Sequence, residues 1–110
     1  MFSEVLEYYL PGAQITLPGG PMTGSYDGHS QISEMIETAV KEYGRPRVRI
    51  ESIHEVDNTV FVETLSTMDG AVNSPIESHN FHVFDFEGDK VRRHRVFTDA
   101  AVAPHPAPPR

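Results

Sequence analysis

The stretch Ile76–Asp99 constrains the fold most, because it has the pattern of two long strands joined by one tight turn. Apolar and polar side chains alternate on both sides of the turn segment Glu87–Lys90. Phe84 and Phe86 fall on one face of the first strand, and Phe81 falls on the other. The stretch therefore predicts a large, twisted antiparallel hairpin.

Composition excludes several classes of partner and chemistry. The chain of 110 residues has a formal net charge of -7, and an acidic protein repels the phosphate backbone of nucleic acids. It contains no cysteine, which excludes disulfides, thiolate metal sites and thiol nucleophiles. No apolar run is long enough to cross a bilayer, and the N-terminus is acidic where a signal peptide is basic. We therefore expect a cytoplasmic protein with neither a nucleic-acid nor a membrane partner.

A long helix is predicted ahead of the hairpin. Ser30 can cap its start, with Asp27 also within reach, and Gly44 and Pro46 end it. Its apolar residues recur at helical spacing and form one stripe: Ile32, Met35, Ile36, Ala39, Val40 and Tyr43.

Shorter elements surround this helix. Phe2–Leu10 has helical spacing and ends at Pro11–Gly12, and Ala13–Leu17 predicts a short strand. Arg47–Val56 and Thr59–Met68 predict a second hairpin, which precedes the one at Ile76–Asp99.

The order of these elements is typical of an α+β fold. We expect a strongly curved antiparallel sheet that wraps around the long helix and forms a cone with a mouth, preceded by a shortened helical part. Residues 1–99 form this single domain, and the prolines of residues 100–110 predict a disordered tail.

Three local patterns add a family resemblance. They are Gly-Ser-Tyr-Asp-Gly-His at Gly24–His29, Phe-Asp-Phe-Glu-Gly-Asp-Lys-Val at Phe84–Val91, and Arg-Val-Phe-Thr-Asp at Arg95–Asp99. Together with the element order, they resemble the nuclear transport factor 2-like superfamily, over about Leu6–Asp99. That group includes SnoaL-like polyketide cyclases, limonene epoxide hydrolases and ketosteroid isomerases. Its members begin with longer helices that close the cone, so the resemblance leaves three alternatives: a truncated start, a more open pocket, or a dimer partner that covers it.

The resemblance also allows a comparison with the catalytic positions of those enzymes. The isomerase base corresponds to Leu17, and the acid that stabilises its oxyanion corresponds to His82. The charged hydrolase positions on the second hairpin strand correspond to Thr64 and Ser66, and the acid after Arg95 corresponds to Val96. These departures argue against all three known chemistries in their standard form.

A candidate pocket follows from strand alternation combined with the resemblance. If His82 faces the cone, Asn80 and Phe84 lie beside it, and the resemblance places His94, Val96 and Thr98 inward. We expect His82 and His94 to lie nearly opposite each other and to act as a catalytic acid/base pair. The alternative is that both are half-buried histidines whose hydrogen bonds are purely structural. The predicted ligand-binding residues are Leu17, Thr64, Ser66, Asn80, Phe84 and Val96.

No cofactor is expected. His79 and His82 are an odd number of residues apart, so a regular strand sends them to opposite faces and disfavours a zinc site. Gly19–Gly20 lacks the Gly-Lys-Ser/Thr sequence that a phosphate-binding loop requires. Asp99 is expected either to orient Arg93 or Arg95 by a charged hydrogen bond or to cap a turn.

Two functional hypotheses remain. The first is a SnoaL-like domain that binds a small hydrophobic molecule and acts on it by cofactor-independent chemistry of the isomerase, cyclase, lyase or hydrolase type. The second is a non-catalytic ligand-binding or dimerisation module of the same fold. Under either hypothesis we expect a homodimer that forms through the exposed face of the sheet.

Overall fold

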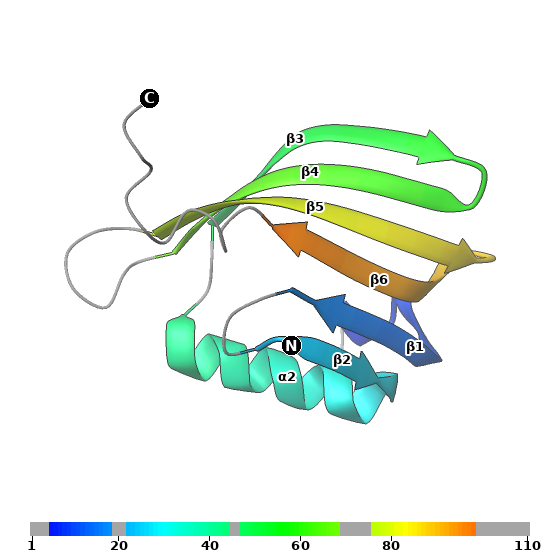
Figure 1. Cartoon of the computed structure of the whole chain (residues 1–110). Coiled ribbons are helices and arrows are strands. Elements are labelled where there is room, and N and C mark those ends of the chain that lie inside the picture. The colour runs from blue at the N-terminus through cyan, green and yellow to red at the C-terminus, as the bar shows by residue number, and fades with distance from the viewer. Residues whose placement is uncertain (1–4, 19–21, 45–46, 69–75, 99–110) are drawn as a thin grey trace.

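The computed structural model describes residues 5–18, 22–44, 47–68 and 76–98. This part of the chain forms one long helix, α2 (Gly28–Tyr43), and a single six-stranded sheet. The strands are β1 (Tyr9–Leu17), β2 (Gly24–Asp27), β3 (Arg47–Val56), β4 (Thr59–Met68), β5 (Ile76–Glu87) and β6 (Lys90–Thr98). Their order across the sheet is β2-β1-β6-β5-β4-β3 (Figure 1).

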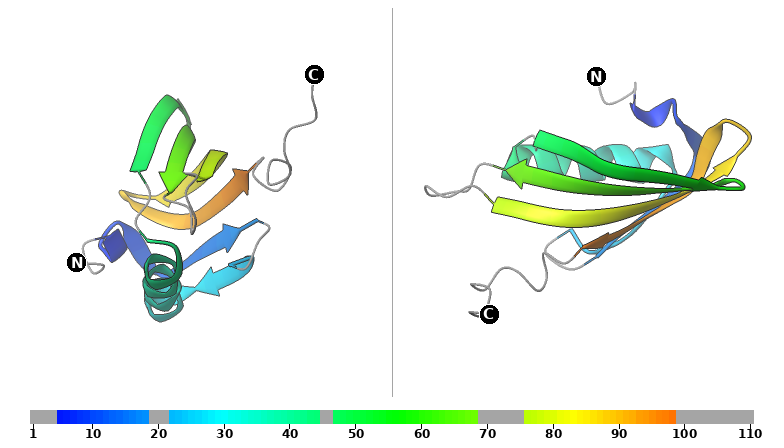
Figure 2. Two further views of the ribbon diagram at one scale, coloured as in Figure 1. Left: turned by 90° about the vertical axis from the view of Figure 1, so that its left-hand side faces the viewer. Right: turned by 90° about the horizontal axis from the view of Figure 1, so that it is seen from above.

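The sheet is curved and unclosed, as the α+β prediction requires (Figure 2). Strands β3, β4, β5 and β6 are antiparallel neighbours, which confirms both predicted hairpins. The predicted fold class is confirmed, with one departure from an antiparallel sheet: β1 runs parallel to β6. Parallel neighbours require a long crossover, and here every element from β2 to β5 lies between the two strands in sequence.

The hydrophobic core lies between α2 and the β1–β2 end of the sheet (Figure 1). Ile32 of α2 and Ala13 of β1 are completely buried, and Ile15 and Met35 pack beside them. Strand β3 lies at the far edge and is exposed at nearly every position. One helix therefore covers only part of the inner face, the face that α2 packs against. None of the helical residues described is part of a segment that could span a membrane.

The N-terminal prediction is wrong in one respect. Among the described residues ahead of β1, only Val5 and Leu6 are helical. Tyr9 begins β1, which continues through Pro11–Gly12. Pairing with β6 shifts register between Tyr9 and Gln14, and such an irregularity tolerates a proline, which has no amide hydrogen to donate. A backbone hydrogen bond of 2.8 Å from the Val91 amide to the Tyr8 carbonyl fixes this end of β1.

The segment before α2 also differs from the prediction. Gly24–Asp27 forms a short strand, β2, which was not predicted and which pairs antiparallel with β1. Helix α2 starts at Gly28 rather than after Ser30. Asp27 is the N-cap residue but makes no side-chain capping bond; instead its amide donates to the Gln31 side-chain oxygen at 2.8 Å. A strand of four residues carries too little alternation to be detected in the sequence.

A β-bulge in β6 sets the orientation of the residues beyond it. Phe86 pairs with Val91, whereas Asp85 pairs with Arg93, so Arg92 is an extra residue on β6. If the ladder ran on from Phe86–Val91 without a bulge, Arg92 would pair with Asp85 and His94 would pair with Val83, on the face opposite to His82. The bulge therefore turns His94 toward the inner face.

Candidate functional site

Four polar side chains form a continuous hydrogen-bonded chain across the inner face. Tyr9 Oη lies 3.1 Å from His94 Nδ1, and His94 Nε2 lies 2.8 Å from His82 Nδ1. His82 Nε2 in turn lies 3.3 Å from Thr64 Oγ1. The four residues come from β1, β6, β5 and β4, so the sheet register alone brings them together.

The register explains each contact in this chain. His82 is opposite Val96, and His94 is opposite Phe84, so the two histidines are diagonal rather than directly opposite. The predicted proximity is therefore confirmed, but its geometry differs because of the bulge at Arg92. Diagonal neighbours on one sheet face remain within reach of long side chains.

Burial keeps the chain uncharged near neutral pH. Burial lowers the pKa of His94 from 6.5 to about 3, and the neighbouring His82 lowers it further within that shift. Burial also lowers the pKa of His82 and raises that of Tyr9 to about 12. Neutral imidazole has one donor and one acceptor nitrogen, so each histidine can both donate and accept within the chain.

A largely apolar cavity of about 410 Å³ lies beside this chain on the inner face. It is lined by Val5, Tyr8, Tyr9, Val60, Val62, Phe84, Phe86 and Val91. The Phe84 ring stacks on His94, with ring centroids 4.1 Å apart, and lies 5.9 Å from the His82 ring. Two walls of the cavity, Tyr9 and Phe84, therefore contact the histidines directly.

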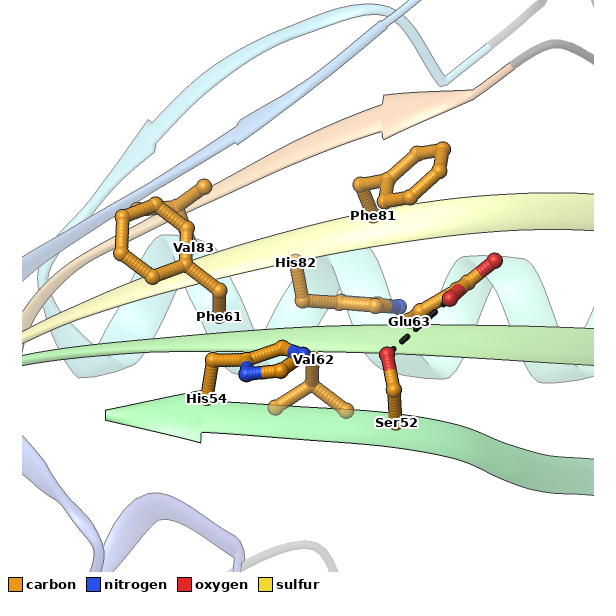
Figure 3. A pocket seen from close by; sticks show the side chains of 8 residues that line it. All are labelled: Ser52, His54, Phe61, Val62, Glu63, Phe81, His82 and Val83. Carbon is orange, nitrogen blue, oxygen red and sulfur yellow. Dashed lines mark hydrogen bonds between the residues drawn. The ribbon is translucent and has the colours of Figure 1, made fainter. Parts of the chain in front are cut away.

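A smaller hollow of about 210 Å³ involves residues of β3, β4 and β5 (Figure 3). Alternation places Phe61, Glu63 and Phe81 on the outer face, opposite to Thr64 and His82. The Glu63 carboxylate accepts hydrogen bonds from His79 Nε2 at 2.5 Å and from Ser52 Oγ at 3.0 Å. These two bonds, that of His79 first, lower the pKa of Glu63.

The predicted ligand-binding residues divide into three groups. Thr64 belongs to the hydrogen-bonded chain, and Phe84 joins the chain to the cavity. The Asn80 amide donates to Ser66 Oγ at 3.3 Å, two positions along the same strands from His82 and Thr64.

The remaining two predicted residues lie at the margin of the site. Val96 is opposite His82 on the neighbouring strand. Leu17 packs against the hydrophobic core, two positions beyond Ile15, the residue that pairs with His94.

Tyr9 is not among the site residues predicted from the sequence. Its position fits the apolar spacing of the helix predicted at Phe2–Leu10, which gives no indication of a role in the site. In the structure it begins β1, and the His29 side chain on α2 is hydrogen-bonded to its carbonyl oxygen at 2.9 Å. No local signal identifies such a residue, because its partner His94 is 85 positions away.

The outer face carries a separate ionic cluster. Asp85 accepts hydrogen bonds from Arg93 Nε at 3.1 Å, from Arg95 Nη2 at 3.2 Å and from Thr59 Oγ1 at 2.9 Å. Burial alone would raise the pKa of Asp85, but the hydroxyl and the two guanidinium groups outweigh burial and lower it.

The predicted partner of these arginines, Asp99, lies outside the described residues, as does the predicted tail at 100–110. Within the described ranges, no group of three or more histidine or carboxylate side chains could hold a metal ion.

Comparison with known proteins identifies the family. The family model of the SnoaL-like domain matches residues 2–94. The chain belongs to the SnoaL-like domain family. A comparison with curated proteins finds no match for this SnoaL-like domain.

Solved structures share its fold at low sequence identity. A nuclear transport factor 2-like protein of unknown function from Burkholderia pseudomallei is 18% identical with a TM-score of 0.83, over 91% of this chain and 79% of that one. TerC, co-crystallised with polyporic acid, is 17% identical with a TM-score of 0.82, over 91% and 80% of the two chains. A protein from Jannaschia sp. named as a candidate SnoaL-like polyketide cyclase is 20% identical with a TM-score of 0.74, over 94% and 76%.

Proposed function

We propose that this SnoaL-like domain binds a small, neutral, hydrophobic molecule in the inner-face cavity and acts on it by acid/base chemistry. The proposal depends on one observation: Tyr9 and Phe84 line the cavity and also contact the hydrogen-bonded histidines. An apolar cavity next to a few convergent polar groups is the usual composition of a small-molecule site.

The electrostatics of the site select the kind of substrate. The lowered pKa values of His82 and His94 keep both rings neutral at pH 7. A charged ligand would be costly to bury there without a partner of opposite charge. A neutral substrate that loses and regains a proton, as in isomerase, cyclase or lyase chemistry, fits a neutral hydrogen-bonded chain in which Tyr9 lines the cavity and the two histidines pass the proton on. The reported co-crystal of TerC with polyporic acid supports a small-molecule role for this fold.

Exchange of an activated C–H bond provides a direct test. 1-Indanone is a neutral bicyclic ketone whose α-hydrogens exchange with deuterium when a base removes them and an acid returns them. We expect the protein to accelerate this exchange in D₂O, and the double variant His82→Gln, His94→Gln to reduce the acceleration on the order of a hundredfold. His54→Gln, at an exposed position on β3, is the matched control and should exchange at the wild-type rate. Undiminished acceleration in the double variant would disprove the histidine chemistry.

A second role, dimerisation, is favoured by the outer face. Phe81 and Phe97 are directly opposite each other on β5 and β6 and are 46% and 51% exposed, and Phe61 is 43% exposed nearby. Soluble monomers rarely expose a contiguous apolar patch of this kind, so we propose that a second copy of the chain covers it.

Sedimentation at micromolar concentration tests the dimer. We expect a homodimer in the wild type and a monomer when Phe81→Ser and Phe97→Ser are combined. Val48→Ser removes an equally exposed apolar side chain from the inner face of β3 and should leave the dimer intact. A monomeric wild type at this concentration would contradict the proposal.

A further inference from the structure

Tyr9 is the buried residue with a polar side chain among those that line the cavity. The eight described residues that line the cavity include neither histidine, and only Tyr8 and Tyr9 among them have a polar side-chain atom. Tyr8 is 68% exposed, whereas Tyr9 is 9% exposed. Tyr9 is therefore the one buried side chain of this lining that could bond a polar ligand atom, and its hydroxyl lies 3.1 Å from His94 Nδ1.

The hydrogen-bonded chain behind Tyr9 has two complete arrangements. In the first, Tyr9 donates to His94 Nδ1, His94 Nε2–H donates to His82, and His82 Nε2–H donates to Thr64. In the second, every bond is reversed: Thr64 donates to His82 Nε2, His82 Nδ1–H donates to His94, and His94 Nδ1–H donates to Tyr9. Both arrangements contain the same number of protons and satisfy all three bonds, and they differ in the tautomers of both histidines.

The direction of the chain determines what the ligand meets. In the first arrangement the Tyr9 proton is used by His94, so its oxygen can only accept a hydrogen bond from the ligand. In the second, the Tyr9 oxygen accepts from His94 and its proton is free to be donated to the ligand. The low pKa of His94 removes the charged imidazolium as a competing state near neutral pH.

We propose that Tyr9, His94, His82 and Thr64 form a reversible hydrogen-bond chain that lets Tyr9 present either a donor or an acceptor to a neutral bicyclic ligand. This inference rests on the proposed function, because it concerns the same cavity. It identifies the ligand class as small apolar molecules with one neutral polar atom, which can be a carbonyl oxygen or an N–H group.

Three molecules of similar shape separate the two directions. Indane has no polar atom, 1-indanone can only accept, and indole can only donate through its N–H. We expect 1-indanone and indole to bind about threefold to tenfold more tightly than indane, the gain typical of one neutral hydrogen bond. The ¹⁵N shifts of the rings should show Nδ1–H on both histidines with 1-indanone and Nε2–H on both with indole.

Two variants locate the effect. Tyr9→Phe should remove the preference for both polar ligands while indane affinity stays the same. Tyr26→Phe is the matched control, because it removes a tyrosine hydroxyl that lies outside the cavity lining. Thr64→Val removes the hydrogen-bond partner of His82 Nε2. In the first arrangement this nitrogen carries a hydrogen, so a donor is left unsatisfied, and in the second it carries none, so only an acceptor is left unsatisfied. Because an orphan donor is the rarer and costlier of the two, this variant should shift the preference toward 1-indanone.

The outcomes distinguish this inference from the proposed function. If none of the three molecules binds to the wild type, the proposed function fails and the inference fails with it. If all three bind equally, or if the histidine tautomers are the same in the 1-indanone and indole complexes, the cavity binds ligands but the reversible chain is wrong. Should Tyr9→Phe not fold, the tautomers in the wild-type complexes still decide the question.

Discussion

Acidification should destabilise this SnoaL-like domain through His94. His94 is 9% exposed, and burial lowers its pKa from 6.5 to about 3. In the unfolded chain, His94 takes up a proton as the pH falls below 6.5, whereas in the folded chain it stays neutral until about pH 3. A lowered histidine pKa therefore contributes stability that is fully present above pH 6.5 and is lost progressively between there and about pH 3.

The size of the effect follows from the same two pKa values. At pH 5 the pH lies about 1.5 units below the unfolded-state pKa of 6.5, whereas folded His94 is still neutral. Protonation therefore lowers the free energy of the unfolded chain relative to the folded one by about 2 kcal/mol. Small domains are stable by only about 5–15 kcal/mol, so this loss is easy to measure. The shift of His82 has the same sign and adds to it.

Urea unfolding followed by circular dichroism at pH 7, 6 and 5 is the appropriate assay. The free energy of unfolding should be compared between the wild type and His94→Gln, which has no ionisable group at this position. Carboxylates elsewhere titrate equally in both proteins, so the difference between their free energies of unfolding, called the gap below, isolates the contribution of His94. We expect the gap to shrink by about 2 kcal/mol from pH 7 to pH 5. A gap that stays constant over this range would refute the argument that His94 is held neutral by burial. His54→Gln, which replaces an exposed histidine, is the control for the loss of a histidine as such.

Three further predictions concern the frame of the site. Gly88 has a φ of 67°, so Gly88→Ala should lower the free energy of unfolding by about 1–2 kcal/mol, whereas Gly12→Ala, which has open space around its added methyl group, should not. Ile32→Ala removes a fully buried side chain from α2 and should cost about 2–5 kcal/mol in urea unfolding; a cost below about 1 kcal/mol would mean that α2 does not hold the core. Asp85→Asn weakens two charged hydrogen bonds and should cost about 1–3 kcal/mol at pH 7, while Glu51→Gln on exposed β3 should change thermal stability little.

Local periodicity was sufficient to predict the long helix and both hairpins. The apolar stripe from Ile32 to Val40 and the alternation in Ile76–Asp99 each depend on residues close in sequence, so the chain carries the signal itself. The family resemblance placed His94 on the inner face correctly. Counting Arg92 as a regular ladder residue would have paired His94 with Val83, on the outer face.

The missed features depend on partners that are distant in sequence. The bulge at Arg92 exists only relative to β5, and β1 begins at Tyr9 only because β6 lies beside it. Helical spacing and a strand with an irregular register look alike over so short a segment. For that reason the sequence identified the two histidines but not the tyrosine that connects them to the cavity.

The exposed edge strand β3 affects how this protein can associate with other chains. A long unpaired edge is a template on which a foreign strand can form a ladder. In β3 the pairing register shifts between Ile50 and Ser52, so the backbone on either side of Glu51 no longer follows one continuous ladder. A strand from another molecule could align with Arg47–Ile50 or with Ser52–Val56, but not with both in a single register, and the edge is thereby kept from acting as one long template.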